Sequence, residues 1–220
     1  MASRVLEPDE VREILSELVK RLDARGEEAV IHVIGGAAIA LMNPARVATE
    51  DVDGYIRLAD ASDVLAELER DYDLTSGWFN WRAQGLQPPV AGPDMWQEVY
   101  REGSVSLLAA TRESLLAMKL NAGRTKDTND IIWLLGELGI SEYADAERIF
   151  EDHYPGDVLK PAAEQRLAYA IEQVNRHGGS SPDGLDRAAP RTPRDLPKPL
   201  PATSGPTLSE LLGEARAEER

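Results

Sequence analysis

The chain of 220 residues has no cysteine and only three histidines, at positions 32, 153 and 177, with no metal-motif spacing between them. The lack of cysteine excludes disulfides, a thiolate nucleophile and cysteine-ligated zinc, and the histidine spacing argues against a histidine-rich metal site. No apolar run, residues 29–41 included, is long enough to span a bilayer, and no secretory signal begins the sequence. We therefore expect a cytoplasmic protein without membrane contact.

Basic residues are scarce. The 24 Lys and Arg stand against 39 Asp and Glu, which gives a formal net charge of −15. Such a chain repels a phosphate backbone at long range, so non-specific nucleic-acid binding is disfavoured, although a local basic patch is still compatible with it. A DNA-binding regulator is disfavoured too, because no basic recognition helix is visible. The hydrophobic fraction of 42% is enough for a folded core.

Composition changes sharply near residue 178. Residues 178–206 hold seven of the fourteen prolines, four glycines and no aromatic residue, which predicts a disordered Pro-rich linker. In the last segment, 207–220, Leu208, Leu211 and Leu212 fall on one helical face. A helix this short is marginal alone. The tail is therefore either a frayed end or a segment that docks on a partner or on the body of the protein.

Residues 1–177 combine strand and helix patterns. Short β-branched apolar runs predict strands at 29–34, 52–58 and 105–108, with further short strands within 77–103. Helical periodicity predicts helices beginning at Pro8 and at Ser62 and over 37–42, 111–122, 129–138, 145–152 and 161–176. The predicted fold is therefore α+β: a small mixed β-sheet lobe with flanking helices over 1–110, then a C-terminal helical lobe over 111–177.

The predicted strand at 29–34 ends in a glycine pair, Gly35 and Gly36, followed by a short helix. A helix N-terminus presents unpaired backbone N–H groups, and glycine allows a phosphate to approach them closely. Asp51 and Asp53 follow, and residues two apart on a strand project from the same face. Adjacent carboxylates repel each other unless a divalent cation such as Mg²⁺ or Mn²⁺ binds between them.

Each half of this pattern has an ordinary explanation, because a glycine pair is usually a turn and an Asp-x-Asp is usually a solvated strand edge. Their combination is rarer. A phosphate cradle beside a carboxylate pair is the minimum needed for metal-assisted nucleotidyl transfer. We therefore favour the functional interpretation.

A second cluster of charged residues lies within 116–131. Lys119 interrupts an apolar helix face, and Arg124, Lys126, Asp127 and Asp130 follow. In isolation, Lys119 would extend to solvent and the acids would favour a helix start. Beside a phosphate site, Lys119 and Arg124 become natural triphosphate contacts.

Together these motifs resemble the minimal nucleotidyltransferases of the DNA polymerase β superfamily, with particular likeness to the AbiEii-like group that includes the MenT toxins of toxin–antitoxin and phage-defence systems. The resemblance covers roughly residues 28–138. It is carried by Gly-Gly-Ala-Ala at 35–38, Arg46, Thr-x-Asp-Val-Asp at 49–53, Trp-x-Asn at 78–80 and Met-Lys-Leu-x-Ala-Gly-Arg-x-Lys-Asp-x-x-Asp at 118–130.

The resemblance implies a role for each matching residue. Gly35 and Gly36 would hold phosphates, and Asp51 and Asp53 would ligate Mg²⁺ (or Mn²⁺). The nucleotide-binding cations would be Arg46, Lys119, Arg124 and Lys126, and either Asp127 or Asp130 would serve as a base or orienting group. The sequence departs from the family pattern at Ala37, which replaces a hydroxyl residue, at Gly54, which replaces an apolar one, and on strand 105–108, which lacks a carboxylate; Glu98 and Glu102 lie upstream.

The function implied is an Mg²⁺-dependent enzyme that moves NMP from an NTP to a hydroxyl acceptor, either a tRNA 3′ end or a protein. As a toxin it would have a cognate antitoxin. A local positive funnel of Arg46, Arg82, Lys119, Arg124 and Lys126 would favour RNA. The alternative is a non-catalytic nucleotide- or partner-binding module of the same fold, tethered by its Pro-rich tail.

Overall fold

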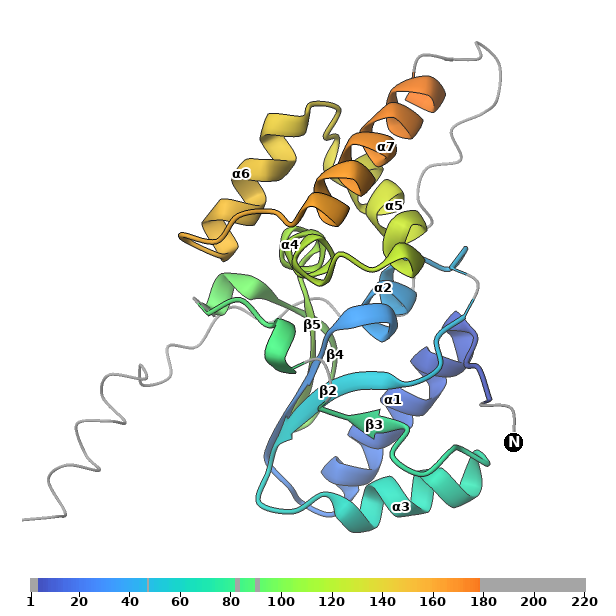
Figure 1. Cartoon of the computed structure of the whole chain (residues 1–220). Helices are drawn as coiled ribbons and strands as arrows, with labels where there is room; N and C mark the ends of the chain where they lie inside the picture. Colours follow the sequence, from blue (N-terminus) through green and yellow to red (C-terminus); the bar gives the residue numbers. More distant parts are fainter. Residues whose placement is uncertain (1–3, 47, 82–83, 90–91, 179–220) are drawn as a thin grey trace, which may run out of the picture. The chain divides into compact units, whose positions relative to one another are not determined.

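A five-stranded mixed sheet forms the centre of the N-terminal half, in the strand order β3-β2-β1-β5-β4 (Figure 1). The computed structural model describes residues 4–46, 48–81, 84–89 and 92–178. The strands are β1 (Ala29–Val33), β2 (Val52–Arg57), β3 (Phe79–Asn80), β4 (Trp96–Glu102) and β5 (Val105–Ala110). β1 runs antiparallel to β2 and parallel to β5, β2 runs parallel to β3, and β4 runs antiparallel to β5.

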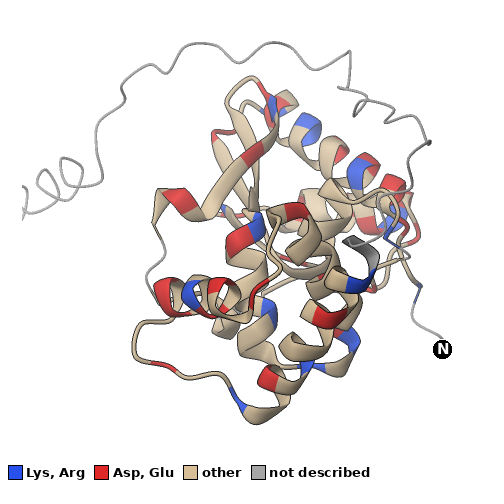
Figure 2. Ribbon diagram, turned by 90° about the horizontal axis from the view of Figure 1, so that it is seen from above, with Lys and Arg blue, Asp and Glu red and all other residues tan. Residues whose placement is uncertain are grey.

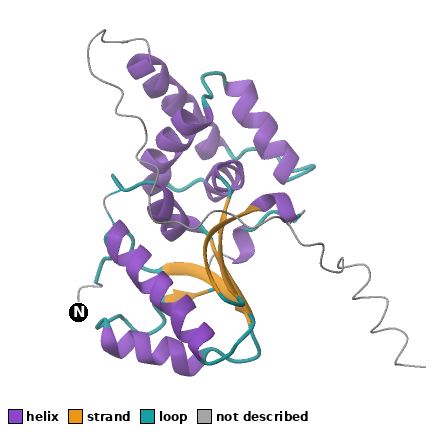
Figure 3. Cartoon of the chain, turned by 180° about the vertical axis from the view of Figure 1, so that it is seen from behind, coloured by secondary structure: helices purple, strands orange, loops and turns teal. Residues whose placement is uncertain are grey.

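One face of the sheet is covered by α1 (Pro8–Ala24), with α3 (Ser62–Asp71) packed beside that helix (Figure 3). The amphipathic spacing of α1 buries its apolar stripe, from Val11 to Leu22, against sheet residues such as Ile31 and Leu107. Full burial of a side chain such as leucine contributes about 1.5–3 kcal/mol, so this layer is a main source of stability.

The short helix α2 (Gly35–Met42) follows β1 directly, because Gly35 adopts a left-handed φ of 66° that turns the chain out of the strand. At the second strand, Gly54 lies so close to β1 that an added Cβ would come within 2.4 Å of the His32 carbonyl oxygen. The glycine that departs from the family pattern is thus needed for close strand pairing.

The second half is helical. It comprises α4 (Arg112–Ala122), α5 (Thr128–Leu138), α6 (Tyr143–His153) and α7 (Pro161–Gly178), with short 3₁₀ turns η1 (Gln84–Leu86), η2 (Pro93–Met95) and η3 (Thr125–Asp127). Thr111 caps α4 by accepting a hydrogen bond from the Ser114 amide, and Gly123 ends it with a left-handed φ of 58°. α4 packs against α5, α6, α7 and α2, and so joins the helices to the sheet.

The α+β fold predicted from the sequence is confirmed. Acidic and basic residues occur together on several of the helices (Figure 2). In the described part of the chain no helix is long and apolar enough to cross a membrane. The predicted linker beyond Gly178 and the tail at 207–220 lie outside the described residues, and the domain boundaries at 110, 177 and 206 stay predictions.

Candidate active site

A pocket of about 270 Å³ lies between the start of α2, the segment that leads into β2, and the end of α4 with η3. Its size is near the lower end of ligand pockets, roughly 300–1,000 Å³. The lining combines backbone, carboxylate and basic groups: Gly35, Gly36, Arg46, Ala48, Thr49, Glu50, Asp51, Asp53, Leu86, Leu115, Met118, Lys119, Ala122, Arg124, Lys126 and Asp127.

The glycine pair forms one wall, and neither glycine has room for a side chain. A Cβ on Gly35 would lie 3.1 Å from Asp53 Oδ2, and one on Gly36 would lie 2.9 Å from both Arg46 Nη2 and Thr49 Oγ1. The amides of the first turn of α2 have no acceptor within the helix. The wall therefore offers N–H donors next to a carboxylate and a guanidinium.

The predicted metal ligands Asp51 and Asp53 both line the pocket. Asp53 lies within β2, opposite Asn80 of β3, and Asp51 immediately precedes the strand. The Asn80 side-chain amide donates to Asp51 Oδ2 at 3.1 Å, and the Thr49 hydroxyl donates to the Asp51 carbonyl at 3.1 Å. These bonds fix the Asp51 segment while its other carboxylate oxygen stays available.

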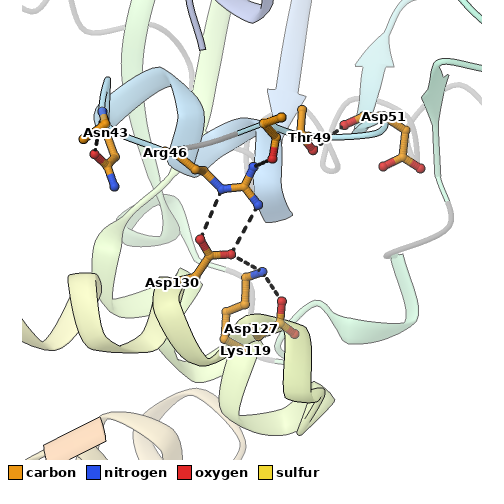
Figure 4. Close-up of polar contacts among 9 residues, drawn as sticks. Asn43, Arg46, Thr49, Asp51, Lys119, Asp127 and Asp130 are labelled. Carbon is orange, nitrogen blue, oxygen red and sulfur yellow. Dashed lines mark hydrogen bonds and ion pairs between the residues drawn. The ribbon is translucent and has the colours of Figure 1, made fainter. Parts of the chain in front are cut away.

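A buried charge network of four residues, Arg46, Lys119, Asp127 and Asp130, joins the sheet side to the helical side (Figure 4). Asp130 Oδ1 accepts from Arg46 Nε at 3.1 Å, and Asp130 Oδ2 accepts from Lys119 Nζ at 2.8 Å. Lys119 Nζ also donates to Asp127 Oδ1 at 2.5 Å. Asp130 therefore lies between the two cations and links them.

This network holds the Asp130 carboxylate ionised. Burial raises the pKa of Asp130, but the charge of Lys119 and the hydrogen bonds from Arg46 and Lys119 outweigh it, so the pKa lies below its usual value of 3.8. The Lys119 side chain is only 11% exposed. Lys119 therefore does not extend to solvent but is held by two carboxylates.

The other two basic residues predicted to bind the nucleotide, Arg124 and Lys126, are not part of the charge network. Arg124 and Lys126 are exposed, line the pocket from the turn between α4 and α5, and have no ion pair within the described residues. We call these two residues the basic turn. Arg166 of α7 supports it by donating to the Gly123 carbonyl at 2.6 Å and to Thr125 Oγ1 at 3.0 Å.

Nine of the ten predicted site residues line this one pocket, and the tenth, Asp130, stands behind Arg46 and Lys119. Arg82, predicted as part of the basic funnel, lies outside the described residues. The sequence analysis did not single out Thr49 or Asn80 as individual site residues. Both lie in the quoted motifs, and a hydroxyl or amide at a fixed offset from Asp51 was the available signal.

Neither of the two upstream candidates for a third carboxylate, Glu98 and Glu102, lines the pocket. Glu98 on β4 is bound to Arg101, and Glu102 accepts from the Tyr100 hydroxyl. Within the described ranges no group of three or more His, Cys, Asp or Glu side chains is placed to hold a metal. Two hard carboxylates suit Mg²⁺, which commonly keeps several waters and takes its other ligands from substrate phosphates. The donor set therefore fits magnesium bound together with a nucleotide.

The comparisons with known proteins agree with this chemistry. A family model described as "Nucleotidyltransferase of unknown function (DUF6036)" matches residues 10–135, more than half of the 220-residue chain. Neither the curated proteins nor the solved structures contain a significant match. The matched range includes every residue of the pocket and of the charge network. The chain therefore belongs to this family of nucleotidyltransferases.

Proposed function

We propose that the protein is an Mg²⁺-dependent enzyme that transfers NMP from an NTP to a hydroxyl acceptor. One observation carries the proposal: Asp51, Asp53, the glycine wall and the basic turn line the same pocket. Carboxylates for a cation, amides for phosphate and unpaired basic side chains for a polyphosphate are the groups that phosphoryl-transfer chemistry requires.

In the proposed reaction, the acceptor hydroxyl attacks the α-phosphorus of the NTP, the bond to the diphosphate leaving group breaks, and the hydroxyl proton passes to water. Asp51 and Asp53 would hold the magnesium ion, which when bound would supply charge neutralisation at the phosphate oxygens and a lower pKa of the attacking hydroxyl. Arg124 and Lys126 of the basic turn bind the negatively charged leaving group. Gly35 and Gly36 bind phosphate oxygens through their amides.

The charge network has a different role. Arg46 and Lys119 are already hydrogen-bonded to carboxylates, so we assign them to positioning the two sides of the pocket. Asp127 and Asp130 each accept from Lys119, which favours the orienting role over the general-base role that the family resemblance left open.

The acceptor and biological context are proposed at the level of the AbiEii-like resemblance. The acceptor would be a tRNA 3′ end or a protein hydroxyl, and the protein would act in the cytoplasm as the toxin of a toxin–antitoxin or phage-defence system. A cognate antitoxin, or another partner recognised by the tail at 207–220, completes this hypothesis.

The decisive experiment compares Asp51→Ala and Asp53→Ala with the wild type, using labelled NTPs and Mg²⁺ against tRNA and cell lysate. We expect label transfer to fall at least about 100-fold in each variant, because the preorganised charge at the reacting phosphate is lost. Induced expression should slow growth only when Asp51 is intact.

The matched control is Asp63→Ala, which removes an exposed carboxylate on α3 that does not line the pocket and should leave label transfer and growth unchanged. Equal labelling by wild type and the Asp51→Ala, Asp53→Ala double variant would contradict the enzymatic proposal.

A non-catalytic nucleotide-binding module is the second candidate, and the two-carboxylate donor set favours it because the family pattern has a third. Calorimetry separates the two. NTP binding that is independent of Mg²⁺ and unchanged in Asp53→Ala would support the binding module, whereas binding that requires both supports the enzyme.

A further inference from the structure

A row of aromatic side chains extends from the carboxylate pair along the same sheet. Side chains two apart on a strand share a face, so Tyr55 projects on the side of Asp53, about 7 Å further along β2. Its ring stacks on His32 of β1, with centroids 4.3 Å apart and planes within 8°. Trp81 lies against Tyr55 at 5.0 Å, and Trp96 meets His32 edge-on at 4.5 Å. We call these four residues the aromatic row.

The row lies on the sheet face opposite α1. β1 alternates between Ile31, which is fully buried in the hydrophobic core, and His32, which is covered by the rings of Tyr55 and Trp96. In the described part of the chain, α1 and α2 are the helices that pack substantially on the sheet. Trp81 is 51% exposed, and Tyr55 is half-buried. The outer rings are thus accessible while the inner rings support them.

The row is uncharged at neutral pH. Burial lowers the pKa of His32 to about 4, with a smaller contribution from the charge of Arg57, so the imidazole is neutral. An uncharged set of stacked rings binds flat, uncharged groups rather than phosphates or carboxylates. Stacking of a nucleobase on an aromatic side chain contributes about 1–3 kcal/mol per base and tolerates any base.

We propose that the aromatic row binds a nucleobase of the acceptor, with Trp81 as the stacking platform, so that the acceptor is a nucleic-acid end rather than a protein. This inference rests on the proposed function. The position of the row supports it, because Tyr55 lies two residues from Asp53 on the same face of β2, so a nucleotide stacked on Trp81 beside Tyr55 would lie next to the carboxylates. A protein hydroxyl would have no use for a parallel ring stack two residues from the carboxylates.

The test measures binding of a short single-stranded oligoadenylate with a free 3′ hydroxyl to the full chain, by fluorescence anisotropy, with Mg²⁺ and a non-hydrolysable NTP. Trp81→Ala should weaken this binding by about tenfold, within the range of one lost stacking contact, and Trp81→Phe should restore most of it. Tyr169→Ala is the matched control, because Tyr169 of α7 is 50% exposed but far from the pocket in sequence, and it should change nothing.

Salt gives an independent readout. Binding through stacking should change little between about 50 and 200 mM salt, whereas binding through phosphate contacts would weaken steeply. The proposal is overturned if the wild type does not bind the oligonucleotide, if Trp81→Ala binds it as the wild type does, or if a serine- and tyrosine-containing peptide binds in its place.

Failure of the proposed function is distinguishable from failure of this inference. If Asp53→Ala retains wild-type NTP affinity in Mg²⁺ while Trp81→Ala still loses the oligonucleotide, the aromatic row stands and the catalytic proposal falls. If NTP binding requires Asp53 but oligonucleotide binding is unchanged in Trp81→Ala, the catalytic proposal stands and the proposal for the aromatic row falls.

Discussion

The pocket has two pairs of basic residues whose surroundings are opposite. Arg46 and Lys119 are nearly buried, at 17% and 11% side-chain exposure, and both are bound to Asp130. Arg124 and Lys126 are exposed on the basic turn, with no ion pair among the described residues. The same kind of charge therefore serves two purposes: the buried pair holds the protein's own carboxylates, and the exposed pair is available to a ligand.

The largest effect is expected from removing the shared carboxylate of the buried pair. Asp130→Ala removes the carboxylate partner of the largely buried Arg46 and leaves Lys119 with Asp127 alone, which costs about 3–5 kcal/mol in the free energy of unfolding. Urea denaturation followed by circular dichroism measures it. The exposed pair of Arg148 and Asp145 on α6, 2.8 Å apart, is the control, because Asp145→Ala should cost no more than about 1 kcal/mol. Equal losses would show that burial of the network has no energetic importance.

Substitution of the exposed pair should affect ligand affinity rather than stability. Arg124→Ala and Lys126→Ala should each weaken NTP binding by about tenfold, because each removes one charge-assisted contact, and the effect should shrink with added salt. The free energy of unfolding should change by less than about 0.5 kcal/mol. Calorimetry with Lys20→Ala, an exposed lysine on α1, as control checks both points. A loss of stability without a loss of affinity would reverse the assignment of the two pairs.

The smallest effect expected is the pH dependence of the free energy of unfolding that comes from Asp130, the carboxylate bound by the buried pair. Because the folded-state pKa of Asp130 is below its usual 3.8, its ionised form stabilises the fold at every pH above that value, and this stabilisation is lost as the pH falls through the folded-state pKa. The slope from one such group is at most about 1.4 kcal/mol per pH unit. Subtracting the urea stability curve of Asp130→Asn from that of the wild type isolates it. A difference that is flat in acid would contradict the ionised network.

Local sequence patterns were sufficient to predict most of the helices and strands. The β-branched run at 29–34 predicted β1, observed at Ala29–Val33, and the helix predicted at 161–176 is observed at Pro161–Gly178. β4 was expected only as an unspecified short strand, because Trp96–Glu102 mixes polar and aromatic residues without a clean alternation and contains an irregularity between Glu98 and Tyr100.

The site was predictable as a set of residue types but not as a set of contacts. The motifs predicted which residues gather at the pocket. They did not predict that Asp130 would bind Arg46, 84 positions away, since that pairing depends on how α5 packs against the sheet. The aromatic row was missed because Tyr55 belongs to no motif, although its position two residues after Asp53 on one strand was a usable signal.

The tight fit around Gly36 has a consequence for comparing related proteins. Any larger residue there would collide with the Arg46 guanidinium and the Thr49 hydroxyl, whether or not a nucleotide ever binds. A relative that had lost the reaction but kept this arginine and threonine in place would still favour glycine at this position. Conservation of the glycine pair in a distant homologue is therefore evidence for the fold. Only conservation of Asp51 and Asp53 would be evidence for the reaction.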